Sequence, residues 1–269
     1  MQFRCKQNSL TLLLMSDLHF DSPECDTGLL KRHLNEARDR GALVFIRGDI
    51  FDVMQSRHDK RRSLSHLKPA HKTDDYLTAV LDEFTAFIMP YRECIGAISP
   101  GNHESAIRRE CNIDLLRLLA NRLEVPLQTY AGFTQFTICP HGKTAAQATM
   151  YHHHGFGGDS FATKAMGHAN RMALDVQGAD IYHSGHTHTN WIHRAEYLFC
   201  NSDGTVVPKS ALHIKTAGYK PSRRSGNSWE TERNHGVKGS GAAWVEITAA
   251  RDRTGGVDHC RIITKASEA

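Results

Sequence analysis

The chain has 269 residues, of which 40% are apolar and 23% charged, a composition typical of globular proteins and unlike that of disordered or fibrous ones. Its net charge is +4, from 33 basic and 29 acidic residues. No apolar run approaches the ~20 residues that cross a bilayer, and residues 12–15 are too few for the core of a signal peptide. We therefore expect no membrane partner.

Seven cysteines are spread along the chain without a C-x-x-C pair. This spacing favours reduced thiols over a disulfide framework or a zinc–thiolate site. The sequence therefore predicts a cytoplasmic protein.

The first half of the chain alternates predicted strands with predicted helices. Nearly continuous apolar runs predict buried strands at 10–16, 42–46 and 94–99. Apolar residues at helical spacing predict helices at 24–40, 74–91 and 107–123. The basic, histidine-rich residues 56–72 form a long connection, which is uncommon in a compact domain unless it has a function.

After Pro126 the pattern changes to short strands, predicted at 127–130, 133–138, 146–152, 179–184, 190–199, 205–215, 242–248 and 258–264, with a helix near 163–175. No internal repeat or linker divides the chain. We predict a single α/β domain over residues 1–269, with two sheets packed together and helices outside them. Basic insertion loops are expected at about 53–75 and 218–241.

Five short polar blocks each follow a predicted apolar strand. They supply carboxylate, carboxamide and imidazole groups, which are ligands of hard and borderline divalent cations. In open α/β sheets, ligands collect beyond the carboxyl ends of strands. The blocks in that position are Asp17-Leu18-His19, Gly48-Asp49-Ile50-Phe51-Asp52, Gly101-Asn102-His103-Glu104, His152-His153-His154-Gly155 and Gly185-His186-Thr187-His188.

Most blocks, taken alone, have an ordinary structural interpretation. Asp17 and His19 fit a turn, and Asn102 fits a helix cap. The two imidazoles of His186 and His188 are less easily explained, because such a pair is rarely needed for packing. Together and in this order, the blocks predict a two-metal hydrolase.

The five blocks resemble the signature of the calcineurin-like metallophosphoesterase superfamily, over about residues 11–190. The resemblance implies an α/β fold in which a β-sandwich of two packed mixed sheets is flanked by helices, in four layers, α/β/β/α. A second similarity, to phage- and prophage-type phosphoesterases, lies in residues 153–158, 216–220, 229–230 and the basic insertion at 56–72.

The resemblance implies a centre of two divalent metal ions, and Mn, Fe, Ni and Zn all suit mixed oxygen and nitrogen ligands. One ion would be held by Asp17, His19 and His188. The other would be held by Asn102, His186 and one histidine of the triple, with Asp49 bridging the two ions.

The ligand supplied by the three consecutive histidines 152–154 is the one left undecided in this set. The family pattern selects His153, whereas strand alternation leaves His152 or His154 open. The resemblance also assigns two further roles: His103 matches the family's catalytic imidazole, and Asp52 matches its usual partner.

Two cations a few ångströms apart lower the pKa of a bridging water, so the expected reaction is hydrolysis of a phosphate mono- or diester. Six Lys/Arg in 56–72 and seven in 209–238 favour a nucleic-acid substrate, although such runs are usually solvated loops. The predicted phosphate contacts are Arg57, Arg61, Arg62, Arg223 and Arg224.

Two alternatives stay open. One is a phosphatase for a small phosphorylated metabolite, and the other is a non-catalytic metal-binding accessory protein. The presence of His103 disfavours the accessory protein. The sequence makes no prediction of oligomeric state.

Overall fold

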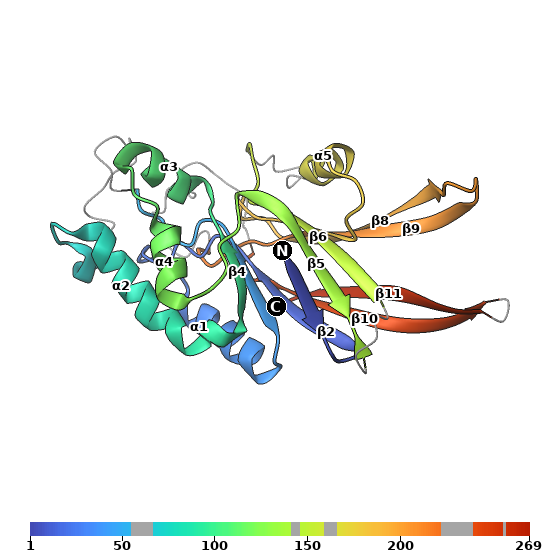
Figure 1. Cartoon of the computed structure of the whole chain (residues 1–269). Helices are drawn as coiled ribbons and strands as arrows, with labels where there is room; N and C mark the ends of the chain where they lie inside the picture. Colours follow the sequence, from blue (N-terminus) through green and yellow to red (C-terminus); the bar gives the residue numbers. More distant parts are fainter. Residues whose placement is uncertain (55–66, 141–145, 159–165, 222–238, 255–256) are drawn as a thin grey trace.

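Two mixed β-sheets pack face to face in the computed structural model, which describes residues 1–54, 67–140, 146–158, 166–221, 239–254 and 257–269 (Figure 1). The six-stranded sheet contains, in spatial order, β1 (Gln2–Cys5), β5 (Ala131–Ile138), β6 (Ala146–His153), β7 (Ile181–Ser184), β9 (Val206–Lys215) and β8 (Trp191–Cys200). The five-stranded sheet contains β11 (Val257–Glu268), β10 (Ala243–Thr254), β2 (Ser9–Met15), β3 (Leu43–Arg47) and β4 (Ile95–Ser99).

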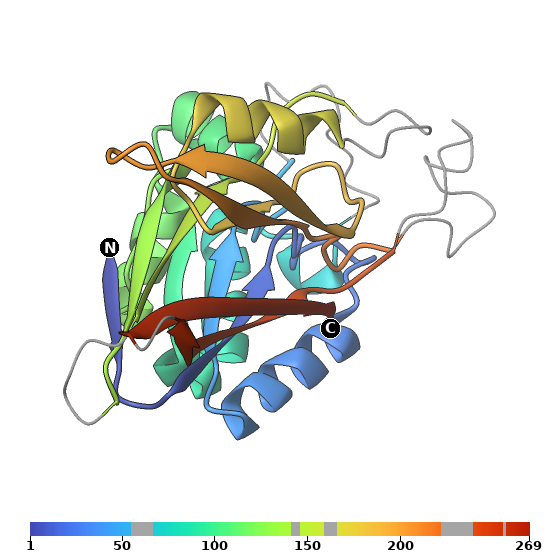
Figure 2. The same cartoon turned by 90° about the vertical axis from the view of Figure 1, so that its right-hand side faces the viewer.

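Helices cover the outer faces of both sheets (Figures 1 and 2). The five-stranded sheet is covered by α1 (Thr27–Asp39), α2 (Tyr76–Ile88), α3 (Asn102–Cys111) and α4 (Leu115–Leu123), with the short 3₁₀ helices η2 (Pro69–His71) and η3 (Met89–Cys94). The six-stranded sheet is covered by α5 (Gly167–Asp175). The predicted fold class, two mixed sheets flanked by helices, is confirmed.

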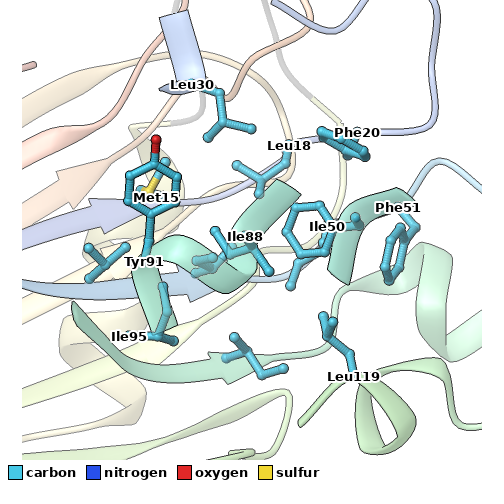
Figure 3. Packing of buried hydrophobic residues seen from close by; sticks show 14 of the residues in the cluster. Met15, Leu18, Phe20, Leu30, Ile50, Phe51, Ile88, Tyr91, Ile95 and Leu119 are labelled. Carbon is cyan, nitrogen blue, oxygen red and sulfur yellow. The ribbon is translucent and has the colours of Figure 1, made fainter. Parts of the chain in front are cut away.

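The apolar run of β2 is explained by burial on both faces. Leu12 and Leu14 point into the core between the sheets, while Leu13 and Met15 join the core under the helices. Figure 3 shows Met15 in this second core, with Tyr91 close by. Burying each such side chain stabilises the fold by about 1.5–3 kcal/mol, which is why the sequence of β2 lacks alternation.

Two expectations about the elements were wrong. The helix expected at 107–123 is two helices, because Asn112 adopts a left-handed backbone (φ 55°) and Asp114 caps a new helix by accepting from the Arg117 amide at 3.0 Å. The strand expected at 127–130 is only a single bridge, between Ile98 and Leu127.

The parallel strands bring the polar blocks to one edge. β2, β3 and β4 run parallel in one sheet, and β6, β7 and β9 run parallel in the other. At the carboxyl ends of these strands the residues that face the other sheet become polar. This buried layer, the polar floor, consists of Ser16, Arg47, Ser99, His152, His183 and Thr216, and each follows an apolar core residue by two positions.

None of the helices in the described segments is long and apolar enough to cross a membrane. The cysteines whose side chains are described are all free thiols.

Candidate metal centre

Six of the seven side chains predicted as metal ligands converge above the polar floor. They come from the chain segments that follow β2, β3, β4 and β7, and a histidine that follows β6 joins them. The resulting set is Asp17, His19, Asp49, Asn102, His154, His186 and His188.

The first group contains Asp17, His19 and His188, whose ligand atoms lie within 4.8 Å of one another. The Nε2 atoms of His19 and His188 are 3.1 Å apart, and Asp17 Oδ1 lies 3.6 Å from His188 Nε2. His19 Nδ1 lies 2.8 Å from Asp52 Oδ1. A carboxylate behind an imidazole is the arrangement that orients a metal-binding histidine.

The second group contains Asp49, His154 and His186, together with Asn102. Asn102 Oδ1 lies 3.1 Å from His154 Nε2 and 2.8 Å from His186 Nδ1. The other nitrogen of each imidazole donates to a backbone carbonyl, of Arg47 and of Gly157 respectively. With these tautomers, two nitrogen lone pairs face one amide oxygen, an arrangement suited to a cation between them.

The two groups adjoin each other through a carboxylate. Asp17 Oδ1 lies within 4 Å of one nitrogen from each group, 3.6 Å from His188 and 3.9 Å from His154. Asp49 Oδ2 lies 3.2 Å from His154 Nε2. The groups are therefore close enough to hold neighbouring ions.

Among the three consecutive histidines 152–154, the expected ligand His153 does not face the centre. His152 points into the polar floor, and His153 points to the opposite face of the sheet, where its Nδ1 accepts from the Gly155 amide at 2.9 Å. His154 lies beyond the end of β6, fully buried, and its Nε2 faces Asn102 and Asp49. The structure thus brings His154, and not His153, into the centre.

His103 and Asp52 lie at the edge of the first group. His103 Nδ1 lies 2.5 Å from the Asp52 carbonyl, so this nitrogen carries the proton, and Nε2 lies 3.9 Å from Asp49 Oδ2. The Asp52 carboxylate itself lies closer to His19 than to His103, at 2.8 Å against 3.8 Å. Asp52 therefore orients two imidazoles, one through its carboxylate and one through its backbone.

The backbone at the centre is in an uncommon conformation. Asp17, His19, Asp49, His186 and His188 all have positive φ, between 44° and 76°. Non-glycine residues rarely adopt this region, and such residues cluster at functional sites, where the surrounding structure offsets their strain. The departure from strand geometry allows side chains two positions apart to converge.

Two glycines make room for the centre. A Cβ on Gly48 would lie 2.2 Å from His154 Nδ1, and one on Gly101 would lie 2.1 Å from Asp49 Oδ1. Gly48 also has a φ of 84°, which favours glycine. Both positions therefore require the absence of a side chain.

The electrostatics of the centre favour positive charge. Burial alone would raise the pKa of Asp49 and lower that of His154. Their mutual interaction outweighs burial, so the pKa of the Asp49 carboxyl is held well below its usual range and the pKa of His154 is raised to about 10. Burial is outweighed in the same way at His19, whose pKa is raised by Asp52. A bound proton or metal ion supplies the positive charge that this environment stabilises.

Three supporting residues were not predicted from sequence. Glu104 is buried and accepts from the amides of Asp49, Phe51 and Gly101 at 2.8–3.1 Å. Asp21 accepts from the amides of Asp52 and Val53 and from the Tyr76 hydroxyl. Lys220 Nζ lies 3.8 Å from Asp52 Oδ2.

The sequence signals for Glu104 and Asp21 differ in strength. Glu104 occupies the third position of α3, where an acidic residue is a recognisable capping signal. Asp21 carries no local signal, because its partners lie 31 to 55 residues away.

All five arginines predicted to contact phosphate lie outside the described part of the chain. This applies to Arg57, Arg61, Arg62, Arg223 and Arg224. Of the basic residues that are described, Lys68 pairs with Glu83 at 3.1 Å and Lys220 pairs with Glu24 at 3.3 Å. These two cations therefore have protein partners.

The donor set fits divalent cations. It combines carboxylate, amide and imidazole atoms, and three of its imidazoles turn one nitrogen toward the centre while the other faces a protein oxygen. The model of the calcineurin-like phosphoesterase family matches residues 10–190. The chain therefore belongs to this family of metal-dependent phosphoester hydrolases.

The solved structures that match the chain are distant in sequence. A metallophosphoesterase from Sphaerobacter thermophilus is 11% identical, covering 88% of this chain and 83% of its own, with a TM-score of 0.34. GAP50, the anchor in the inner membrane complex of Plasmodium, is 13% identical over 96% and 90%, with a TM-score of 0.44. Vps29 of Chaetomium thermophilum is 10% identical over 96% and 98%, with a TM-score of 0.32. Comparison with curated proteins gives no match.

Proposed function

We propose that the protein is a dinuclear-metal-dependent phosphoesterase, with one ion on Asp17, His19 and His188 and the other on Asn102, His154 and His186. Asp49 is the proposed bridge. The observation that supports this most is the convergence of five chain segments on two adjoining ligand groups. His154 replaces His153 in the proposed ligand set, because its Nε2 faces Asn102 and Asp49.

Bound there, two divalent cations supply a hydroxide near neutral pH and neutralise charge on the phosphoryl oxygens. His103 is the proposed catalytic imidazole. Its Nδ1 is held by the Asp52 carbonyl, and its Nε2 faces the centre from the Asp49 side. From this position Nε2 can hydrogen-bond a phosphoryl oxygen or protonate a leaving alkoxide.

The substrate class in this proposal is a phosphate mono- or diester. A non-catalytic accessory role is disfavoured, because the chain keeps both the ligand set and His103 with its oriented Nε2. We further propose that residues 1–269 act as one domain, that the dispersed free cysteines reflect a reducing, cytoplasmic setting, and that residues 153–158 mark a relationship to phage-type phosphoesterases.

The test is hydrolysis of bis(p-nitrophenyl) phosphate and p-nitrophenyl phosphate by protein loaded with Mn²⁺, Fe²⁺, Ni²⁺ or Zn²⁺, with metal content measured alongside. We expect two ions per chain, activity lost on chelation, and most activity lost in Asp49→Asn. Asp39→Asn, which changes an exposed acid on α1, is the matched control. A single ion with Asp49→Asn fully active contradicts the dinuclear centre.

A further inference from the structure

A pocket of about 250 Å³ opens between α5 and the outer face of the six-stranded sheet. Its lining combines the rings of Tyr151 and Phe156, the imidazole of His153, the guanidinium of Arg171 and the aliphatic side chains of Met172 and Val176. We refer to it as the aromatic pocket. The metal centre uses none of these residues.

Phe156 is the central ring of this pocket. The His168 ring lies 4.4 Å from it at 33°, the His153 ring lies 5.7 Å away at 89°, and the Arg171 guanidinium lies 4.9 Å over the Phe156 ring. Flat rings beside a guanidinium form a surface that suits a planar, polarisable ligand, through stacking and cation–π contact.

The aromatic pocket is joined to the metal centre by its own chain segment. His153 is the residue before the proposed ligand His154, and the Tyr130 ring contacts both imidazoles, at 5.2 Å and 5.6 Å. His186, another proposed ligand, donates from Nε2 to the Gly157 carbonyl at 3.1 Å. Residues 153–157 therefore run from the aromatic pocket to the proposed ligands His154 and His186.

The surroundings of the pocket are basic and contain an unused polar atom. Lys215 is buried nearby and donates to the Gly185 carbonyl, and the pKa of His168 is lowered first by burial and then by the Lys215 charge. Within the described residues, His168 Nδ1 is buried without a hydrogen-bond partner. Arg171 is two-thirds exposed and paired only loosely with Asp175, at 3.5 Å.

We propose that the aromatic pocket receives the nucleobase of a nucleotide or nucleic-acid substrate whose phosphate lies at the metal centre. This inference rests on the proposed function and narrows its substrate class. Every nucleobase has a π-face that can pack against Phe156 and His153. Its ring nitrogens and carbonyls can accept hydrogen bonds from Arg171, which lines the pocket.

The first experiment compares p-nitrophenyl thymidine 5′-phosphate with methyl p-nitrophenyl phosphate, in which a methyl group replaces the nucleoside. Because Phe156→Ala removes base stacking, we expect it to raise KM for the thymidine ester about tenfold. For the base-free diester, kcat/KM should stay within about twofold of the natural chain's value. Phe156→Tyr should restore the KM. Phe199→Ala is the matched control, since Phe199 also carries a cation over its ring, Lys209 at 3.6 Å, on the distant β8. Equal losses on both substrates, or unchanged KM values, overturn the proposal.

The second experiment does not depend on hydrolysis. Calorimetric titration of the metal-free protein with AMP and with ribose 5-phosphate separates base from sugar phosphate. We expect AMP to bind more tightly than ribose 5-phosphate to the natural chain and equally to Phe156→Ala, with circular dichroism confirming that the variant is folded. Equal binding of AMP and ribose 5-phosphate to the natural chain would overturn the proposal that the pocket receives a nucleobase. Selective binding of AMP without any hydrolysis would overturn only the proposed phosphoesterase function.

Discussion

His154 shows at the scale of one residue how a ligand is chosen among three neighbours. Its Nδ1 donates to the Arg47 carbonyl at 3.1 Å, which turns Nε2 toward Asn102 and Asp49. His153 lies one position earlier, and its side chain is on the other face of the sheet, against Tyr130 and Phe156. The two residues therefore have separate proposed roles, His154 in the metal centre and His153 in the aromatic pocket.

Substitution of these two histidines should separate metal binding from pocket function. Loss of a direct ligand should exceed the 10–100-fold effect of a supporting residue, so we expect His154→Gln to weaken metal binding by more than about 100-fold. His153→Gln should retain two ions per chain. Metal titration of both variants is the measurement, and loss of metal from His153→Gln with retention in His154→Gln would reverse the assignment.

His103 is a single residue whose role can be separated from metal binding. Its imidazole faces the centre through Nε2, 3.9 Å from Asp49 Oδ2, and its backbone amide donates to Asp49 Oδ1 at 3.0 Å. We expect His103→Gln to lower kcat by about 10²–10⁴-fold, the range of general acid–base catalysis, with two ions per chain retained. Loss of metal in step with activity would instead make His103 a ligand.

At the scale of elements, the start of α3 holds two loops together. Glu104 accepts from the amides of Asp49, Phe51 and Gly101, and so ties the ends of β3 and β4 to the helix. Asn102 was expected to fit a helix cap, but the cap is Gly101, and the helix begins before the expected 107–123. The proposed metal ligand Asn102 is thus the first residue of a helix.

Replacement of Glu104 should test this bracing. Glu104→Gln keeps the shape but loses the charge and one acceptor, so buried amides lose part of their hydrogen bonding. We expect the free energy of unfolding to fall by about 1–3 kcal/mol, as measured by urea denaturation. Glu110→Gln, on the same helix and without contacts to these loops, should change it far less. Equal effects would contradict a bracing role.

At the scale of the whole molecule, the polar floor separates the apolar core between the sheets from the metal centre. Ser16 and Thr216 share a hydrogen bond at 2.6 Å, and His183 bonds Thr216 at 3.1 Å, so residues from both sheets are joined across the interior. Burial lowers the pKa of His152 to about 3, with Arg47 adding to the effect. The folded protein therefore holds this imidazole neutral.

This neutral histidine should make stability depend on pH. The folded-state pKa of His152 is below its ordinary value of 6.5, so its contribution is complete above pH 6.5 and is lost as pH falls toward 3. Between pH 7 and 5.5 the natural chain should lose about 1 kcal/mol more unfolding free energy than His152→Gln. Urea denaturation at both pH values is the measurement. Identical pH dependence in the two proteins would show that His152 is not held neutral.

Local sequence signals were sufficient for most of the strands and for where the candidate centre lies, although they missed β1 and wrongly predicted a strand at 127–130. Apolar runs such as that of β2 end in polar blocks, and both signals are contained within a few consecutive residues. Because parallel strands end at the same edge, Asp17, Asp49 and His186 could be expected together without knowledge of the fold, and the structure brings them together.

Tertiary structure alone decided the remaining details. The choice of His154 depends on where the chain leaves the pleat after β6 and on the Arg47 carbonyl, 107 residues away. Asp21 and the aromatic pocket likewise depend on partners that are distant in sequence, Tyr76 for Asp21 and α5 for the pocket. Alternation in a strand specifies which residues share a face, but not which residue turns toward the other sheet where the strand ends. The sequence therefore left His152, His153 and His154 as possible ligands, and only the packing of the two sheets placed one of them, His154, at the centre.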